Sequence, residues 1–250
     1  MWILPIAMLV VTVLLAIPLS RYMTRIMDGK YRAPGFLRWF EDRLNSGSQN
    51  WKQYTFSLLI FNTVLFVFGF IVLALQPWMP LNPQHKGMLS PTTIFHTVVS
   101  FMTNTDVQHY SGDVHFSNFT QIFFGFTMFF LSASIGFCAL TMIIRALRSD
   151  SSVGNFFVDM WRVVAYMFLP ICLILAILFV QQGTPMTFKS FHEVGTLEPA
   201  AMGTLDNGQP KLQTIVVGPL AAFVPMKQLG TNGGGFYGMN SPIPSRIPPP

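Results

Sequence analysis

Long apolar segments alternate with polar connections along this chain. A helix needs about 20 mostly apolar residues to cross the hydrocarbon core of a membrane. Four segments reach that length, and we predict a transmembrane helix in each: roughly 2–20, 56–76, 121–144 and 163–180. The first has no basic residues before it and no small-residue cleavage site, so we interpret it as a retained helix rather than a signal peptide.

Two further apolar runs are too short to cross a membrane. One extends from Pro91 to Met102 and leads into Thr-Asn-Thr at 103–105, and the other covers 212–226 and leads into a glycine-rich segment at 229–236. Irregular backbone is tolerated at membrane depth only where protein or a water-filled path surrounds it. We therefore predict two re-entrant pore loops, in which a short helix dips into the membrane and returns as an extended segment.

Basic residues are concentrated in two of the connections. Of the 15 Lys and Arg residues, seven lie between the first and second spans and three between the third and fourth. By the positive-inside rule these connections are cytoplasmic, so the N-terminus and both pore loops are outside. Two interpretations of the first basic connection stay open: topology setting with contact to anionic lipid, and docking of a cytoplasmic partner. Within it, 34–44 is predicted to form a short interfacial helix.

Composition narrows the protein class. Residues of the set AVILMFWYC make up 51% of the 250 positions and charged residues only 10%, whereas soluble domains are about 25% charged. This excludes a cytosolic globular enzyme, a disordered tail and a disulfide scaffold. Cys138 and Cys172 lie in apolar segments and are interpreted as buried small hydrophobic residues. The histidines have no metal-ligand spacing, so no metal site of that kind is expected.

The polar ends of the two short runs are candidate oxygen ligands. An extended backbone can present a row of carbonyl oxygens that replace an ion's hydration shell, and glycine suits such a segment because it adopts positive φ without a side chain. No acidic residue lies in the second segment, so this site would favour a large, weakly hydrated monovalent cation. A flexible linker at 230–235 and an ordinary turn at 103–105 stay open as alternatives. The recurrence of an apolar run followed by a Thr-Asn pair favours the ion site.

Several motifs occur together in the order and spacing of one known family. They are Asn50-Trp51-Lys52-Gln53-Tyr54, Pro80-Leu81-Asn82-Pro83-Gln84, Ser100-Phe101-Met102-Thr103-Asn104-Thr105 with Gln108-His109-Tyr110-Ser111-Gly112, and Leu229-Gly230-Thr231-Asn232-Gly233-Gly234-Gly235-Phe236. The chain therefore resembles the N-terminal part of the potassium-binding (A) subunit of Kdp-type potassium-transporting ATPases.

The resemblance implies a fold and a set of site residues. The fold would be an all-α membrane protein with four transmembrane helices and two re-entrant pore loops, built from helix–pore loop–helix repeats of which the second is incomplete here. In family members, four such loops surround one potassium selectivity filter. Carried over to this chain, the filter residues would be Thr103, Asn104, Thr105, Gln108, Thr231, Asn232, Gly233, Gly234 and Gly235.

The resemblance also implies partners and a location. Family members work with a catalytic P-type ATPase subunit and small accessory membrane subunits in the bacterial plasma (inner) membrane. No ATP-binding or phosphorylation motif occurs in this chain. We therefore expect a non-hydrolytic subunit that binds potassium ion but no ATP, and that has no nucleic-acid partner.

The boundaries follow from the predicted elements. We divide the chain into an N-terminal transmembrane helix (1–20), a basic cytoplasmic loop (21–55), a first helix–pore loop–helix repeat (56–146), a second repeat without its closing helix (147–241) and a proline-rich tail (242–250). Loss of one base from codons for the family's Ala-His-Pro-Leu-Glu-Asn-Pro would produce the Pro-Ile-Pro-Ser-Arg-Ile-Pro that follows Ser241. We therefore expect a frameshift truncation. The alternative function is a transport-incompetent membrane protein or an assembly partner without its own ion pathway.

Overall fold

The computed structural model describes residues 2–105, 107, 109–150, 152–189, 191–195, 212–233 and 236–237. The chain divides into two compact units, which are described separately. Unit 1 comprises Met1–Leu58 and Phe137–Pro170, and unit 2 comprises Leu59–Gly136 and Ile171–Pro250.

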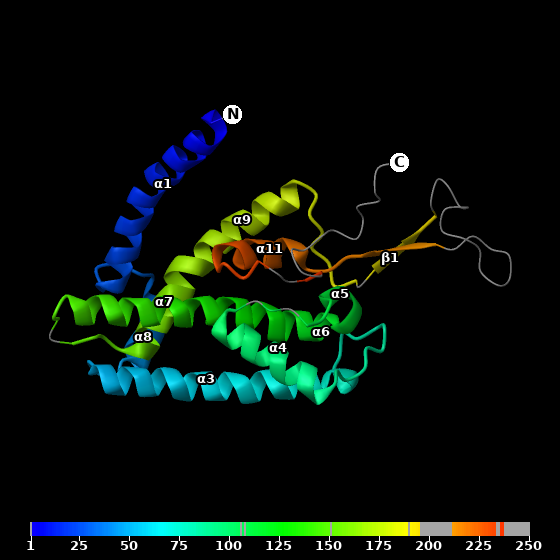
Figure 1. The fold of residues 1–250 in the computed structure, drawn as a ribbon, viewed down its shortest axis with the longest axis horizontal. Helices are drawn as coiled ribbons and strands as arrows, with labels where there is room; N and C mark the ends of the chain where they lie inside the picture. Colours follow the sequence, from blue (N-terminus) through cyan, green and yellow to red (C-terminus); the bar gives the residue numbers. More distant parts are fainter. Residues whose placement is uncertain are drawn as a thin grey trace. The chain divides into compact units, whose positions relative to one another are not determined.

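The predicted spans are present as long helical segments (Figure 1). Four are long and apolar enough to cross a membrane: Ile3–Met27, Trp51–Ala74, Asn118–Leu147 and Phe156–Gln181. The first two are α1 and α3, the third joins α6 (Asn118–Thr120), η2 (Gln121–Phe126) and α7 (Thr127–Leu147), and the fourth joins α8 (Phe156–Arg162), η3 (Val163–Phe168) and α9 (Leu169–Gln181). The prediction of four transmembrane helices in a mostly helical membrane protein is confirmed.

Helix α1 is longer than its apolar core. It was predicted to end near residue 20, but it continues through Arg21 and Arg25 to Met27. A helix is held by its own backbone hydrogen bonds, and long basic side chains can extend from it toward water. The helix therefore need not end where the hydrocarbon does.

Unit 1 contains the predicted interfacial helix. This helix, α2 (Gly35–Leu44), begins after Pro34. Its exposed side chains include Phe36 (70%) and Trp39 (53%), as expected for a helix that lies in a membrane surface. Trp161 of α8 donates a hydrogen bond from Nε1 to the carbonyl oxygen of Leu37, 3.1 Å away, which fixes α2 to α8.

A proline in the fourth span determines another contact of unit 1. Pro170 has no N–H, so the carbonyl oxygen of Tyr166, four residues earlier, loses its usual helical donor. The hydroxyl of Tyr22, on α1, donates to this oxygen. The stretch before Pro170, Val163–Phe168, winds as a π-helix, a local widening that often accompanies displaced helical hydrogen bonds.

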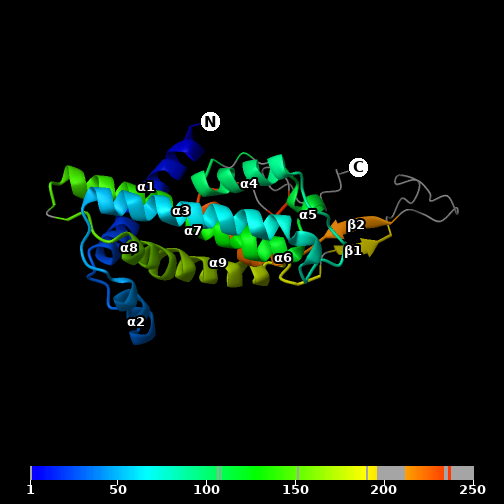
Figure 2. The ribbon, with the colours of Figure 1, turned by 90° about the horizontal axis from the view of Figure 1, so that it is seen from below.

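In unit 2, the short helix α4 (Pro91–Thr103) packs against the portions of α3 and α7 that belong to the same unit (Figure 2). Gly69 of α3 allows this close approach. A Cβ at Gly69 would lie 2.9 Å from the ring of Phe124, 3.0 Å from Met128 and 3.1 Å from Val98. Because protein interiors are packed to near-crystalline density, a larger residue at this position would separate the helices.

The second short apolar run is not one helix. The prediction of a single run over 212–226 is wrong in its first part, which forms strand β2 (Gln213–Val216), antiparallel to β1 (Phe191–Val194). Helix α11 (Leu220–Leu229) follows. The β-branched sequence Thr-Ile-Val-Val favours a strand, and the Gly-Pro pair at 218–219 separates it from the helix.

Both short helices end at or just before a Thr-Asn pair. Helix α4 is capped at its start by Ser90, whose Oγ accepts a hydrogen bond from the amide of Thr93, and at its end by Asn104, which has the left-handed conformation with φ 51°. Helix α11 is capped at its end by Gly230, and the next residue, Thr231, has φ 60°. With 13 and 10 residues, these helices are shorter than a span. Their entry into a membrane as re-entrant loops stays a prediction.

Candidate ion-binding site

The two Thr-Asn segments contact each other in unit 2. The side-chain amide nitrogen of Asn104 donates to the carbonyl oxygen of Gly230 at 3.4 Å and to Thr231 Oγ1 at 3.3 Å. In return, the amide nitrogen of Asn232 donates to Asn104 Oδ1 at 2.5 Å. Segments more than 120 residues apart in the sequence are therefore joined through the side-chain amide of Asn104, which donates to one part of the second segment and accepts from another.

Ser132 of α7 is a third partner in this contact. Its Oγ donates to Asn104 Oδ1 at 3.2 Å and accepts from Asn232 Nδ2 at 3.4 Å. Ser132 is 2% exposed and Asn232 is 1% exposed, so these bonds are shielded from water. We name Asn104, Ser132, Thr231 and Asn232 the amide cluster. Ser132 was not among the predicted site residues, although a serine in an apolar span is a signal that could have drawn attention to it.

The backbone at the amide cluster adopts an uncommon conformation. Asn104, Thr231 and Gly233 have φ values of 51°, 60° and 67°. This conformation is accessible to glycine and tolerated by asparagine, but it is unfavourable for a β-branched threonine. The turn is held by hydrogen bonds to the carbonyl oxygen of Lys227 from the amides of Asn232 and Gly233, at 3.0 and 3.3 Å. Backbone strain of this kind often accompanies a functional site.

Both threonines of the first segment are hydrogen-bonded to α4. Thr103 Oγ1 donates to the carbonyl oxygen of Val99 at 2.8 Å, and the amide of Thr105 donates to the carbonyl oxygen of Ser100 at 3.2 Å. Thr103 Oγ1 and Thr105 Oγ1 lie 3.2 Å apart. Both threonines are exposed, so their oxygen atoms remain accessible to a ligand.

The structure brings most of the predicted site residues into one region. On the first segment, the contact is made by Asn104, which lies between Thr103 and Thr105. On the second segment, it is made by Thr231 and Asn232, which are followed by Gly233. The predicted residues Gln108, Gly234 and Gly235 lie outside the described residues.

The described groups that form the site carry no formal charge. Its described atoms are amide, hydroxyl and carbonyl oxygens, and the described part of the chain contains no group of three or more His, Cys, Asp or Glu residues that could hold a metal ion. Divalent cations are usually bound by carboxylates, whereas potassium is selected by uncharged oxygen dipoles. The donor set fits a monovalent cation.

Two buried glutamines support the surrounding loops and were also missed. Gln76 is fully buried. Its Nε2 donates to the carbonyl oxygens of Gly87 at 2.8 Å and His115 at 3.0 Å. Its Oε1 accepts from the backbone amide of Ser117 at 3.0 Å. Gln121 Nε2 donates to the carbonyl oxygen of Phe236 at 3.0 Å, just beyond the glycine segment. Glutamine in an otherwise apolar stretch was the signal available in the sequence.

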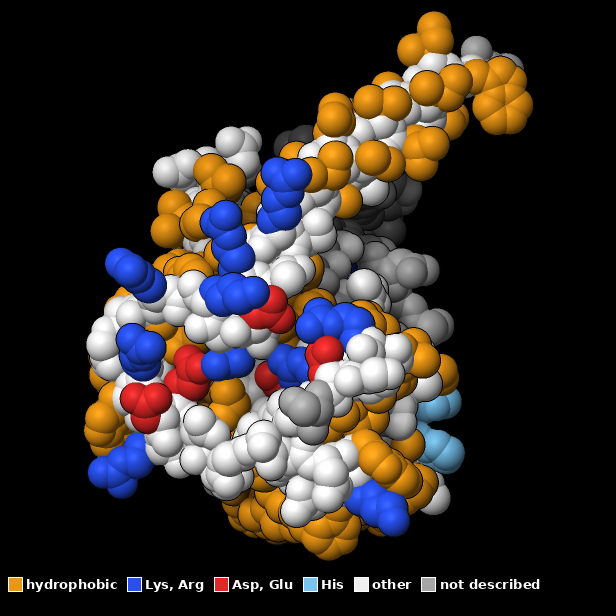
Figure 3. Space-filling model, turned by 90° about the vertical axis from the view of Figure 1, so that its left-hand side faces the viewer, with side chains coloured by type: hydrophobic (Ala, Val, Ile, Leu, Met, Phe, Trp, Pro, Cys, Tyr) orange, Lys and Arg blue, Asp and Glu red, His pale blue; other side chains and the backbone are white. Residues whose placement is uncertain are grey.

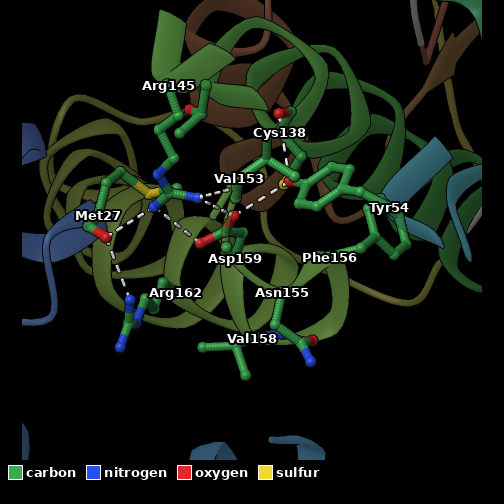
Figure 4. Close-up of polar contacts among 12 residues, drawn as sticks. Met27, Tyr54, Cys138, Arg145, Val153, Asn155, Phe156, Val158, Asp159 and Arg162 are labelled. Atoms are coloured by element: carbon green, nitrogen blue, oxygen red, sulfur yellow. Dashed lines mark hydrogen bonds and ion pairs between the residues drawn. The ribbon is translucent and has the colours of Figure 1, made fainter. Parts of the chain in front are cut away.

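Unit 1 contains a different, charged cluster (Figure 4). Arg145 Nη1 lies 2.6 Å from Asp159 Oδ2, which is also 3.1 Å from the hydroxyl of Tyr54. The carbonyl oxygen of Met27, near the end of α1, accepts from Arg145 Nη2 at 2.9 Å and from Arg162 Nη1 at 3.1 Å. Cations at a helix C-terminus are favourable, so this cluster ties α1 to α7 and α8. Asp159 is neutralised by its partner and is not available as an ion ligand.

Charge is distributed unequally between the two units. All four ion pairs found among the described residues lie in unit 1. Figure 3 shows a face on which Lys and Arg side chains gather, interspersed with Asp and Glu. The amide cluster of unit 2 contains no charged side chain, so the two clusters have different chemical roles.

Comparison with known proteins gives the family. The sequence model of the "Potassium-transporting ATPase A subunit" family matches residues 6–248. A "Potassium-transporting ATPase potassium-binding subunit" from Pseudomonas aeruginosa is 44% identical over 205 residues, which are 81% of this chain and 34% of the relative. Proteins of the same name from Bacteroides fragilis and Clostridium perfringens are 36% and 37% identical, cover 96% of this chain, and are themselves covered to 42% and 43%.

The chain thus spans less than half the length of these relatives. The family match nevertheless extends over nearly all of its residues, and its four long apolar helices indicate a multi-pass membrane protein. This chain belongs to the family of potassium-transporting ATPase A subunits.

Proposed function

We propose that this chain binds potassium ion as part of the potassium-binding subunit of an ATP-driven uptake complex. The observation that carries the proposal is the hydrogen bond from the Asn232 amide to Asn104 Oδ1. This contact places two segments that each contain a Thr-Asn pair, and that each follow a short helix, next to each other. A selectivity filter requires such a convergence because several backbone segments must share one ion.

The selection mechanism follows from the donor atoms. Carbonyl oxygens of the two loops, with the hydroxyl oxygens of the threonines, would replace the hydration shell of the ion. The proposed ligands in the first loop are Thr103, Asn104, Thr105 and Gln108, and those in the second are Thr231, Asn232, Gly233, Gly234 and Gly235. Because these ligands are dipoles rather than formal charges, they favour an ion that loses its water at low cost.

The amide cluster would act behind the ion path. Asn232 and Ser132 are buried, whereas Thr103, Thr105, Thr231 and Gly233 are exposed. The buried amides therefore hold the two segments in register, and the exposed residues present oxygen atoms on the open side. In the longer relatives, we expect further loops to complete the coordination from that side.

The energy for uptake would come from a partner. The relatives are named as the potassium-binding subunit of a potassium-transporting ATPase, and we propose that a separate P-type subunit hydrolyses ATP while small accessory membrane subunits complete the assembly. In this arrangement the chain binds no ATP and is not an enzyme by itself. Its location would be the bacterial inner membrane, with the N-terminus outside because the most basic connections stay in the cytoplasm.

A chimera tests the proposal with the residues of this chain. Residues 1–233 replace the matching part of the Pseudomonas aeruginosa relative, and the chimera is produced with the ATPase subunits of that system in a strain without other potassium uptake. Growth at micromolar potassium and competition by sodium are measured. We expect the chimera to restore growth with preference for potassium.

Two substitutions of Gly233, similar in size and different in charge, form a matched pair of variants for ion selectivity. A Cβ at this position meets no atom within 4 Å, and Asp and Asn are the side chains that best tolerate its positive φ. Gly233→Asp adds a carboxylate and should weaken discrimination against sodium, whereas Gly233→Asn adds a neutral group of the same size and should retain more of it. Equal selectivity in both variants and the parent would contradict the placement of Gly233 in the filter. A chimera that restores no uptake, although it reaches the membrane, would support the alternative of a chain without its own ion pathway.

A further inference from the structure

A polar pocket lies in unit 1 between the end of α1, helix α2 and the start of the fourth span. Its volume is about 170 Å³. The charged and aromatic side chains that line it are Tyr31, Arg38, Glu41, Asp42, Arg162 and Tyr166. The pocket is separate from the amide cluster, and the proposed function does not use it.

The two arginines of this pocket retain donor capacity. Arg162 is bonded through Nε and Nη2 to Glu41 Oε1, at 2.8 and 2.6 Å, and through Nη1 to the carbonyl oxygen of Met27. A guanidinium has five N–H groups, so these bonds leave two of them uncommitted. The side chain of Arg38 makes no hydrogen bond or ion pair with any described residue.

The two acidic side chains of the pocket, Glu41 and Asp42, differ in whether they are bonded to its basic residues. The carboxylate of Glu41 is satisfied by Arg162 and by the hydroxyl of Tyr166, 2.8 Å from Oε2. Asp42 is exposed and makes no ion pair with the described basic residues. The surrounding segment 21–45 contains six basic and three acidic residues, a net charge of +3. The local field therefore favours an anionic ligand.

The positions of the lining residues within the spans would put the pocket at the level of the lipid headgroups. Ile26, which lines it, is next to the last residue of the first span, and Arg162 is within two turns of the start of the fourth. Helix α2 exposes Phe36 and Trp39, which are typical of a helix embedded at the boundary of headgroups and acyl chains. A ligand in this pocket would therefore be within reach of the membrane surface.

We propose that this pocket binds the phosphate group of an anionic phospholipid, with Arg38 and Arg162 as the phosphate donors. Arginine matches the geometry of phosphate oxygens and binds them through two parallel hydrogen bonds. Binding would fasten the end of α1 and helix α2 to the membrane surface. Asp42 on the same pocket opposes an anion and so sets the strength of binding.

The test uses the full chain purified in a neutral detergent. Phosphatidylglycerol with a dansyl-labelled acyl chain is titrated, and energy transfer from tryptophan reports binding, because Trp161 and Trp39 belong to the elements around the pocket. We expect saturable binding that unlabelled phosphatidylglycerol displaces better than phosphatidylcholine does. Arg38→Gln should weaken the affinity by about tenfold or more, because it removes charge-assisted hydrogen bonds to the phosphate. Asp42→Asn should strengthen it.

Arg43 is the matched control for Arg38. It lies on the same helix, with its guanidinium 5.1 Å from the ring centre of Trp39, and it does not line the pocket. Arg43→Gln should leave the affinity nearly unchanged, and circular dichroism should show the same helix content in all variants. Equal weakening by Arg38→Gln and Arg43→Gln, or no response to Asp42→Asn, would overturn the proposal in favour of diffuse attraction. Displacement of the lipid by millimolar inorganic phosphate as effectively as by phosphatidylglycerol would overturn the lipid assignment.

Discussion

Replacement of Asn104 by glycine removes the amide that joins the two Thr-Asn segments and keeps the left-handed backbone. Asn104 takes part in four contacts: it donates at 3.4 and 3.3 Å and accepts at 3.2 and 2.5 Å. A hydrogen bond contributes about 0.5–1.5 kcal/mol net, and the two long ones belong at the lower end. We therefore expect Asn104→Gly to lower the free energy of unfolding by about 2–4 kcal/mol.

A double-mutant cycle separates the contact from other effects of the substitution. Ser132→Ala removes one of the four contacts, so its effect should be smaller when Asn104 is already glycine, with a coupling energy of about 1 kcal/mol. Ser134 provides the control, because it lies on the same helix and its Oγ donates to the carbonyl oxygen of Phe130 in its own helix at 2.6 Å. Ser134→Ala should therefore be additive with Asn104→Gly.

The assay is unfolding of the full chain in mixed micelles with increasing sodium dodecyl sulfate, followed by circular dichroism. The three single variants and two double variants are compared under the same conditions. If Ser132→Ala and Asn104→Gly are as additive as the Ser134 pair, the amide cluster does not exist in the folded protein. The proposal that the two segments share one ion would then lose its support.

Three further predictions test the selectivity of the filter, the buried ion pair and the buried lysine. In the chimera, Gly233→Asp should reduce discrimination between potassium and sodium more than Gly233→Asn does, as measured by ion competition. Asp159→Leu should lower the free energy of unfolding by about 3–5 kcal/mol because it leaves Arg145 buried without its partner. Arg145→Met in the same chain should restore part of that loss. A double variant no more stable than the single one would contradict a buried pair. Burial lowers the pKa of Lys86 below its ordinary value of 10.5, so the protonated form is disfavoured in the folded state and stability should rise as the pH approaches 10.5. Lys86→Met should reduce that rise, and an unchanged pH dependence of unfolding would refute the assignment.

The two short apolar runs show where a local sequence pattern predicts secondary structure correctly and where it does not. Ser90 and Pro91 mark the start of α4 because their local chemistry satisfies the first turn of a helix, and the structure begins the helix there. The run over 212–226 has similar hydrophobicity, yet its first half pairs with β1. Hydrophobicity alone does not distinguish a short strand from a short helix, and the pairing partner lies in another part of the chain.

The missed residues have a common physical origin. Ser132, Gln76 and Asp159 are polar side chains in or beside apolar segments, and the sequence shows no local reason for any of them. Each is satisfied by groups distant in the sequence. Burial of a polar group without a partner is costly, so such residues indicate that a partner exists without indicating which one.

The sequence by itself determined the membrane class, the four spans and the two Thr-Asn segments, because apolar length, charge and residue type are properties of consecutive positions. The tertiary structure decided that Asn104 meets Asn232 and Ser132, and that Arg145 pairs with Asp159. These contacts depend on how helices pack, and packing depends on small features such as the absence of a side chain at Gly69. Hydrogen bonds act over about 3 Å, so only the folded chain can show which distant groups come within that range.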